Sequence, residues 1–249
     1  MLLSPPFRSA ARDYRLLLDR GYPSAAGLKL VGDRYALDKA ARTVLFRGIL
    51  PESLSSAIAA RIVRALPPGA RLAVDGYNVL FTLSNYRRGH PLFIGTDGLV
   101  RDAGGAHGRI QDQGLFLECA RTVVERLSDL GVSFAELYLD APVSGSGAHT
   151  AALRDLLARA GVPGRVELAA SADPPVRDFE GGVEAGQAAG FAAGQAAGFA
   201  AGQAAGFAAT SDSAVAVAAR SPVYDLARDI LEARYGASFP DLGVVVREI

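Results

Sequence analysis

The fold is decided by the stretch Arg71-Leu-Ala-Val-Asp-Gly-Tyr-Asn78, in which a short apolar run ends on an acid. It follows Leu66-Pro67-Pro68-Gly69, where a helix would stop and a strand could begin. Similar strand-like runs occupy residues 134–140, 166–170 and 207–211, and helix-like segments lie between them. Strands interleaved with helices imply crossover connections, so we expect an α/β fold built on a mainly parallel sheet.

The elements around these strands follow from the same periodicities. A further strand is expected at residues 243–247, where three valines follow one another. Helices are expected between and after the strands, at residues 113–130, 148–160 and 223–235.

The residues ahead of the proline pair predict only helices. Residues 10–20 form the first, Ser24 is placed to cap the second, and Asp38 the third. Residues 54–66 space their apolar side chains by four, which predicts a fourth helix. We therefore expect a small all-helical domain at residues 1–66 and an α/β domain at residues 67–249.

Charge is divided unevenly between these two domains. The whole chain has 26 basic and 26 acidic residues, but residues 1–66 carry 11 against 5 and residues 67–249 carry 15 against 21. The first domain therefore has a net charge of +6 and the second −6. The basic face is either a site for the phosphates and bases of nucleic acid or ordinary solvated helix charge. The side chains concerned are Arg12, Arg15, Arg20, Arg34, Arg42 and Arg47, with Tyr14, Tyr22 and Tyr35.

Several features bear on the compartment. The single cysteine, Cys119, excludes an internal disulfide, and the first residues lack the basic-then-apolar order of a signal peptide. We expect a cytoplasmic protein without membrane association. The longest uncharged stretch, residues 185–211, has too many glycines and glutamines to insert into a bilayer. It contains AGQAAGFA three times in tandem, an insertion at residues 185–208 that is either a tolerated expansion or an interaction segment.

Each of four predicted strands is followed closely by an acid. Asp75 and Asp140 end two strands, while Asp173 and Asp212 follow the other two. Because functional groups gather at the carboxyl ends of parallel strands, we expect the four carboxylates in one cleft. Carboxylates that converge repel one another unless a cation neutralises them, and oxygen ligands without cysteine fit Mg²⁺ or Mn²⁺. Such an ion typically serves phosphate chemistry.

These residues resemble a known family. Asp75-Gly-Tyr-Asn78 after an apolar strand, Asp140 at the end of the next, and Thr210-Ser-Asp-Ser213 ahead of a helix are similar to the PIN-like nuclease superfamily, in particular its NYN branch. The segments 12–22, 31–35 and 45–48 resemble a short helical domain that precedes such a body in uncharacterised prokaryotic proteins. The resemblance implies a PIN-like fold and cleavage of phosphodiester bonds in RNA, with DNA as an alternative substrate.

The resemblance also implies roles for individual residues. The acids that match metal ligands are Asp75, Asp140, Asp173 and Asp212. Asn78 matches a residue that orients the first acid. The catalytic residues implied are Asp75, Asn78, Asp140 and Asp212. Thr210 and Ser211 supply hydroxyl groups beside the last acid. The turn with Ser144 and Ser146 could direct amide groups toward a phosphate. Arg101 and the glycine-flanked His107 are further candidates for substrate contact.

Other interpretations of the same residues stay open. Each acid after a strand could instead cap the following helix or form a turn. His90, His107 and His149 are too scattered for a ligand set, and we expect them at the surface or in loops. A non-catalytic RNA-binding module is the main alternative to a nuclease. A phosphatase of the haloacid dehalogenase type is weakened because Tyr77 stands where that chemistry needs a second aspartate.

Overall fold

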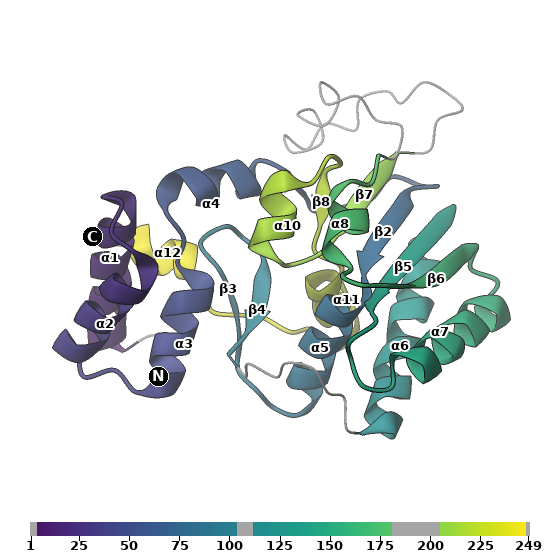
Figure 1. The fold of residues 1–249 in the computed structure, drawn as a ribbon, viewed down its shortest axis with the longest axis horizontal. Coiled ribbons are helices and arrows are strands. Elements are labelled where there is room, and N and C mark those ends of the chain that lie inside the picture. The colour runs from purple at the N-terminus through teal and green to yellow at the C-terminus, as the bar shows by residue number, and fades with distance from the viewer. Residues whose placement is uncertain (1–3, 104–111, 181–204, 248–249) are drawn as a thin grey trace. The chain divides into compact units, whose positions relative to one another are not determined.

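The computed structural model describes the whole chain except residues 1–3, 104–111, 181–204 and 248–249 (Figure 1). The chain divides into two compact units, each described here by itself. The first consists of residues 1–59, 85–105 and 237–249, and the second of residues 60–84 and 106–236. The single boundary predicted between residues 66 and 67 therefore differs from this division, in which the first unit is assembled from three separate segments.

The second unit is built on a six-stranded sheet in the order β1-β8-β7-β2-β5-β6. Every pair of neighbouring strands is parallel. The expected α/β class with a mainly parallel sheet is confirmed. The strands are β1 (Ile62–Val63), β2 (Arg71–Asp75), β5 (Phe134–Asp140), β6 (Gly164–Ala169), β7 (Gly206–Ala209) and β8 (Val223–Tyr224).

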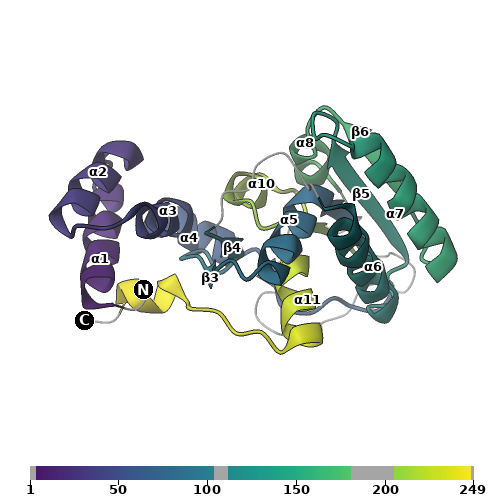
Figure 2. The same ribbon diagram turned by 90° about the horizontal axis from the view of Figure 1, so that it is seen from below.

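Helices pack on both faces of this sheet. Leu72 and Val74 of β2 are fully buried and point to the face opposite to that of Asp75, since side chains alternate along a strand. Figures 1 and 2 show α6 and α7 side by side along β5 and β6. α8 contacts β2 and β7 and also packs on α10. The helices are α5 (Gly76–Arg87), α6 (Gln113–Asp129), α7 (Ser146–Ala160), α8 (Asp173–Arg177), α10 (Ser213–Ala218) and α11 (Leu226–Tyr235).

The first unit combines helices with a short hairpin around its own hydrophobic core. Phe7 and Tyr14 of the first helix meet Leu45, Phe93 and Leu242 in this core. The expected helical N-terminal region is confirmed, and the Asp38 carboxylate caps its third helix by accepting from the Ala41 N–H at 2.8 Å. The elements are α1 (Pro5–Asp19), α2 (Ser24–Arg34), α3 (Lys39–Gly48), α4 (Glu52–Ala59), β3 (Leu92–Ile94), β4 (Val100–Asp102) and α12 (Leu242–Arg247).

The strand predicted at residues 243–247 is wrong, because these residues form helix α12. Asp241 Oδ1 accepts hydrogen bonds from the Gly243 and Val244 N–H groups at 2.7 and 3.3 Å, which starts the helix. The helix then buries Leu242 and Val245 in the core of the first unit. Capping and packing thus outweigh the strand preference of consecutive valines.

Three further elements differ from prediction. The helix expected at residues 54–66 ends at Ala59, and residues 62–63 form strand β1. The helix expected at residues 223–235 begins only at Leu226, after strand β8. The β3–β4 hairpin was not predicted, although an Asp97-Gly98 pair between two apolar runs is a recognised hairpin signal.

Candidate functional site

Four acids lie at the carboxyl ends of four adjacent parallel strands. Asp75 and Asp140 are the last residues of the neighbouring strands β2 and β5. Asp212 follows β7 and Asp173 follows β6, the strands on either side of that pair. Because all four strands run in the same direction, the acids share one edge of the sheet, which we call the acidic rim.

Asp75 is the buried centre of the acidic rim. Only 5 % of its surface is exposed, and burial raises the pKa of its carboxyl group to about 7. The N–H of Asn78 and the hydroxyl of Thr210, at 3.3 and 3.1 Å, act in the opposite direction. The charges of Asp140 and Asp173 add to the rise. Near neutral pH this carboxyl group therefore exchanges a proton readily, and a nearby cation would favour its ionised form.

A network of hydrogen bonds joins Asp75 to the turn after β7. Thr210 Oγ1 donates to Asp75 and accepts from the Asp212 N–H at 3.1 Å. Asn78 Oδ1 accepts from both the N–H and the hydroxyl of Ser211, at 2.9 and 2.8 Å. The side-chain oxygen of Asn78 thus positions this turn, and the hydroxyl groups of Thr210 and Ser211 are buried beside the first acid.

Asp140 binds the backbone at the start of α8, next to Asp173. Asp140 Oδ1 accepts from the Ala172 N–H at 2.8 Å, one residue ahead of Asp173. Partial burial raises the pKa of Asp173, and the charges of Asp212 and Asp140 raise it further. Asp173 therefore lies within the electrostatic influence of two other acids of the rim.

Asp212 is exposed and caps helix α10. Its Oδ1 accepts from the Ala214 and Val215 N–H groups at 2.7 and 3.2 Å. Asp75 has a weaker capping contact of the same kind with the amide of Asn78. Asp212 therefore acts as a helix cap, as one interpretation of the sequence allowed, and it uses one of its two carboxylate oxygens to do so.

The donor set fits a magnesium-type ion held by few protein ligands. In the part of the chain that the structure describes, no three Asp, Glu, His or Cys side chains form a ready metal-binding group. Mg²⁺ keeps several water ligands and is commonly held by one or two carboxylates together with substrate phosphates. Asp75 and Asp140, on adjacent strands and electrostatically coupled, are the pair that fits this requirement.

The residues expected to contact substrate have different environments. Ser144 is exposed in the turn after β5, whereas the Ser146 hydroxyl donates to the Ala141 carbonyl at 3.0 Å. Arg101 belongs to the first unit and is 6 % exposed, with its terminal nitrogens donating to Asp97 at 2.7 and 2.5 Å. That guanidinium group is therefore engaged by an internal carboxylate. His107 lies outside the described residues.

His149 is buried, so its expected place at the surface or in a loop is wrong. It is 1 % exposed, and its Nδ1 lies 2.9 Å from the hydroxyl of Tyr77, which is two positions after Asp75 in sequence. Burial lowers the pKa of His149. His149, Leu153 and Leu157 follow one another at intervals of four residues, which places them on one face of the helix. This spacing was the sequence signal that His149 is buried.

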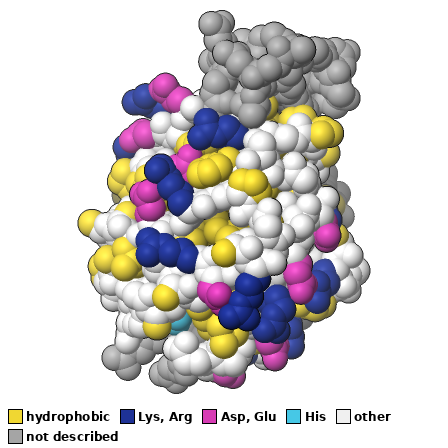
Figure 3. Space-filling view, turned by 90° about the vertical axis from the view of Figure 1, so that its right-hand side faces the viewer, with side chains coloured by type: hydrophobic (Ala, Val, Ile, Leu, Met, Phe, Trp, Pro, Cys, Tyr) yellow, Lys and Arg dark blue, Asp and Glu magenta, His cyan; other side chains and the backbone are white. Residues whose placement is uncertain are grey.

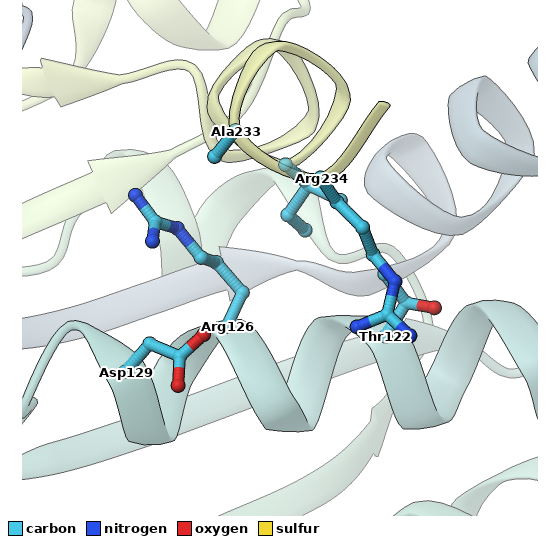
Figure 4. A pocket seen from close by; sticks show the side chains of 6 residues that line it. Thr122, Arg126, Asp129, Ala233 and Arg234 are labelled. Carbon is cyan, nitrogen blue, oxygen red and sulfur yellow. The ribbon is translucent and has the colours of Figure 1, made fainter. Parts of the chain in front are cut away.

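A separate pocket of about 250 Å³ lies between α6 and α11 (Figure 4). Arg126 and Arg234 line it, but each is already paired with a carboxylate. Arg126 binds both oxygens of Asp229 at 2.6 and 2.8 Å, and Arg234 contacts Glu125 at 2.5 Å. This pocket therefore lacks the unneutralised charge of the acidic rim.

Comparisons with known proteins find two family matches and one relative, none of which names an activity. Residues 67–188 match the family described as "Domain of unknown function (DUF5616)", and residues 6–61 match "Protein of unknown function (DUF434)". The chain is 25 % identical over 173 residues to uncharacterized protein MJ0935 of Methanocaldococcus jannaschii, which covers 69 % of this chain and 82 % of that protein. No solved structure matches the chain significantly.

Across the helices that the structure describes, none is both long enough and apolar enough to span a membrane.

Proposed function

We propose that the chain is a PIN-like, metal-dependent nuclease that hydrolyses RNA at the acidic rim. The observation that carries the proposal is the buried Asp75 carboxyl, whose pKa is raised to about 7 in the company of Asp140 and Asp173. A buried, electrostatically strained carboxylate in a site of this kind typically has a functional reason. The short motifs around Asp75, Asp140 and Asp212 supply the resemblance to the NYN branch.

Each residue of the acidic rim has a stated role in this proposal. Asp75 and Asp140 would hold Mg²⁺ or Mn²⁺, which supplies activation of a water molecule and charge neutralisation at the scissile phosphate. Asp173 and Asp212 would add negative charge to the rim, which favours a bound cation. Asn78 and Thr210 hold Asp75 in place through the contacts given above. No covalent intermediate is needed.

A haloacid dehalogenase type of chemistry is disfavoured by Tyr77. That chemistry needs an acid two positions after the first aspartate, but Tyr77 is 1 % exposed and engaged by His149. A non-catalytic RNA-binding module remains the second candidate, favoured by the capping role of Asp212.

RNA is the proposed partner because the first unit has an excess of basic residues and the second an excess of acidic ones. The first unit carries 13 Lys and Arg against 9 Asp and Glu, and the second carries 13 against 17. A basic unit joined to an acidic one would raise the local concentration of a polyanion. Several expected contacts are less available, since Arg15, Arg34, Arg42 and Arg47 pair with acids. Tyr14 is buried and cannot stack on bases.

On the face that Figure 3 shows, the second unit offers no comparable electrostatic attraction for RNA. There, dark blue and magenta side chains lie beside one another. On α7, Arg159 pairs with Asp155, and on β6, Arg165 pairs with Glu167 at 3.1 Å. Pairs of this kind neutralise each other, so the first unit is the better source of affinity for RNA.

The contribution of the first unit can be measured with single arginines. Arg20 is exposed at the end of α1, and Arg20→Gln should lower the slope of log affinity against log salt by about 0.7 for single-stranded RNA. The matched control is Arg34→Gln, because Arg34 is exposed but lies near Asp13. Filter binding at several salt concentrations gives both slopes. Equal slopes for Arg20→Gln and wild type would show that Arg20 does not contact RNA and is an ordinary solvated charge.

The proposed activity is tested by incubating the full-length protein with end-labelled RNA. We expect cleavage with Mg²⁺ or Mn²⁺ and none with excess EDTA, since phosphodiester hydrolysis here depends on a bound cation. Labelled DNA in a parallel reaction distinguishes the two nucleic acids, and a small phosphate ester tests for phosphatase activity. Metal-independent binding of RNA without cleavage would favour the non-catalytic module, and turnover of the ester alone would contradict a nuclease.

A further inference from the structure

His149 lies where three helices of the second unit begin. Tyr77 is the second residue of α5, Gln113 is the first residue of α6, and Gly145 immediately precedes α7. The Tyr77 hydroxyl lies 2.9 Å from His149 Nδ1, and Gln113 Nε2 lies 3.4 Å from His149 Nε2. The imidazole also stacks on Phe116, with ring centroids 3.9 Å apart. The proposed hydrolysis uses none of these groups directly, so their arrangement calls for a separate explanation.

The hydrogen bond between Tyr77 and His149 is shielded from solvent. Both side chains are 1 % exposed. Burial lowers the pKa of His149, which favours a neutral ring. A neutral imidazole has one donor and one acceptor nitrogen, and a hydroxyl group can fill either role, so Tyr77 is a suitable partner for Nδ1 in either tautomer. The Gln113 side-chain amide contacts the other ring nitrogen.

This hydrogen bond reaches the acidic rim on the side of Asp75. Tyr77 stands between Asp75 and Asn78, and the Asn78 N–H donates to Asp75 Oδ1 at 3.3 Å. The Asn78 side chain in turn accepts two hydrogen bonds from Ser211. A displaced Tyr77 would therefore shift the first turn of α5 and change the position of Asp75.

It reaches the rim on the side of Asp140 as well. His149 belongs to α7, which follows β5 and its last residue Asp140 after a short turn. Gly145 in that turn has a φ of +85°, and a Cβ added there would lie 3.4 Å from the imidazole ring. The ring therefore packs directly against the turn that separates Asp140 from α7.

We propose that His149 is a positioning residue that, through its hydrogen bond with the Tyr77 hydroxyl, couples the start of α5 to the start of α7 and holds Asp75 and Asp140 at a fixed separation. This proposal rests on the proposed function, because it assigns the coupling to RNA hydrolysis at the same site. Fixed ligand positions matter for such chemistry, since displacements of about 1 Å can cost 100-fold in rate.

The test uses Tyr77→Phe, His149→Phe and the double variant in the full-length chain. Each single variant leaves one buried polar group without its partner, so its melting temperature should fall, whereas the double variant removes both groups and should recover most of the loss. We expect kcat to fall about tenfold or more in all three, with KM changed less than twofold. The double variant is decisive, because its kcat should stay low while its stability recovers. A kcat that follows the melting temperature would overturn the proposal.

A matched control separates this effect from the loss of any buried tyrosine hydroxyl. Tyr224 is 2 % exposed on β8, paired in register with Ala209 and through it with Val74. It therefore lies on the face of the sheet opposite to that of Asp75. Tyr224→Phe should lower stability and leave kcat unchanged. An equal loss of kcat in this variant would contradict a specific role for Tyr77.

A second measurement does not depend on nuclease activity. Hydrogen exchange at the Asn78 amide of the metal-free protein reports its hydrogen bond to Asp75, and we expect exchange about tenfold faster in all three variants but not in Tyr224→Phe. Unchanged exchange at Asn78 would overturn the positioning role. If the wild-type protein cleaves no RNA, the proposed function fails, and exchange at Asn78 still decides whether His149 positions the acidic rim.

Discussion

Asp75→Asn is expected to lower metal-dependent RNA cleavage by about 1,000-fold, to the background of the assay. The reason is that the amide cannot carry the negative charge that a bound cation requires, and charge stabilisation by such an ion is worth several kcal/mol, with each 1.4 kcal/mol equal to a factor of ten. Binding of Mn²⁺, followed by calorimetry, should be lost in parallel. The fold should persist, because asparagine has nearly the same shape.

The matched control is Asp155→Asn, on the exposed surface of α7 beside Arg159. It removes one negative charge from the same unit without touching the acidic rim, so cleavage should stay within a factor of two. Wild-type rates in Asp75→Asn would show that Asp75 does not bind a catalytic metal ion.

The same substitution should change how stability depends on pH. The pKa of Asp75 is about 7 in the folded chain, against 3.8 for an ordinary aspartate. The folded state therefore binds the Asp75 proton more tightly than the unfolded state does. The stabilisation that results is fully present below about pH 4 and is lost as pH rises through 7. The loss approaches roughly 4 kcal/mol for a shift of about three units. Urea unfolding of the metal-free protein should show a decline in stability between about pH 4 and pH 7 that Asp75→Asn lacks.

Asp97→Ala is expected to destabilise the first unit by about 3–5 kcal/mol, because it removes the carboxylate that both terminal nitrogens of the buried Arg101 guanidinium contact. Asp97 is fully buried, and its two oxygens accept from Arg101 at 2.7 and 2.5 Å across the β3–β4 turn. Asp97 Oδ1 also accepts from the Leu99 N–H at 3.3 Å, so the turn itself would loosen. Thermal and urea unfolding provide the measurement.

Two companion variants make this result interpretable. Asp33→Ala removes an exposed acid of α2 that pairs with Lys29 and Arg42, and it should cost far less stability, because exposed ion pairs contribute little. Asp97→Ala combined with Arg101→Leu should recover much of the stability, since replacing a whole buried ion pair by apolar side chains is often neutral. If Asp97→Ala costs no more than Asp33→Ala, the buried pair contributes little.

The edge of the sheet that bears the acids was predictable because it depends on local pattern and chain direction alone. The boundaries of β2 and β5 coincide with those expected from residues 71–75 and 134–140. Parallel strands end at the same edge, so a carboxylate after each strand must appear there. The strand order could not be predicted, since the short pairing of β1 with β8 joins Ile62 to Val223 across most of the chain.

The details of the candidate site depended on contacts between distant residues. Capping of α10 by Asp212 was one of the alternatives that the local sequence left open, but the local sequence does not reveal that the nearby Thr210 binds Asp75. His149 meets Tyr77 across 72 positions of the sequence, and only the packing of α5, α6 and α7 buries that pair. The raised pKa of Asp75 is likewise a property of its burial and not of its neighbours in sequence.

By itself, the sequence determined the class of fold, the helical start of the chain and the edge of the sheet at which the acids gather. These features follow from hydrophobic periodicity, proline breaks and the shared direction of parallel strands. Only the tertiary structure decided that residues 237–249 join the first unit and that the three consecutive valines around Val245 form a helix. It also decided that His149 is buried against Tyr77. The physical reason is that burial and hydrogen-bond partners are set by residues far apart in the chain, whose contacts outweigh local preferences of about 1 kcal/mol.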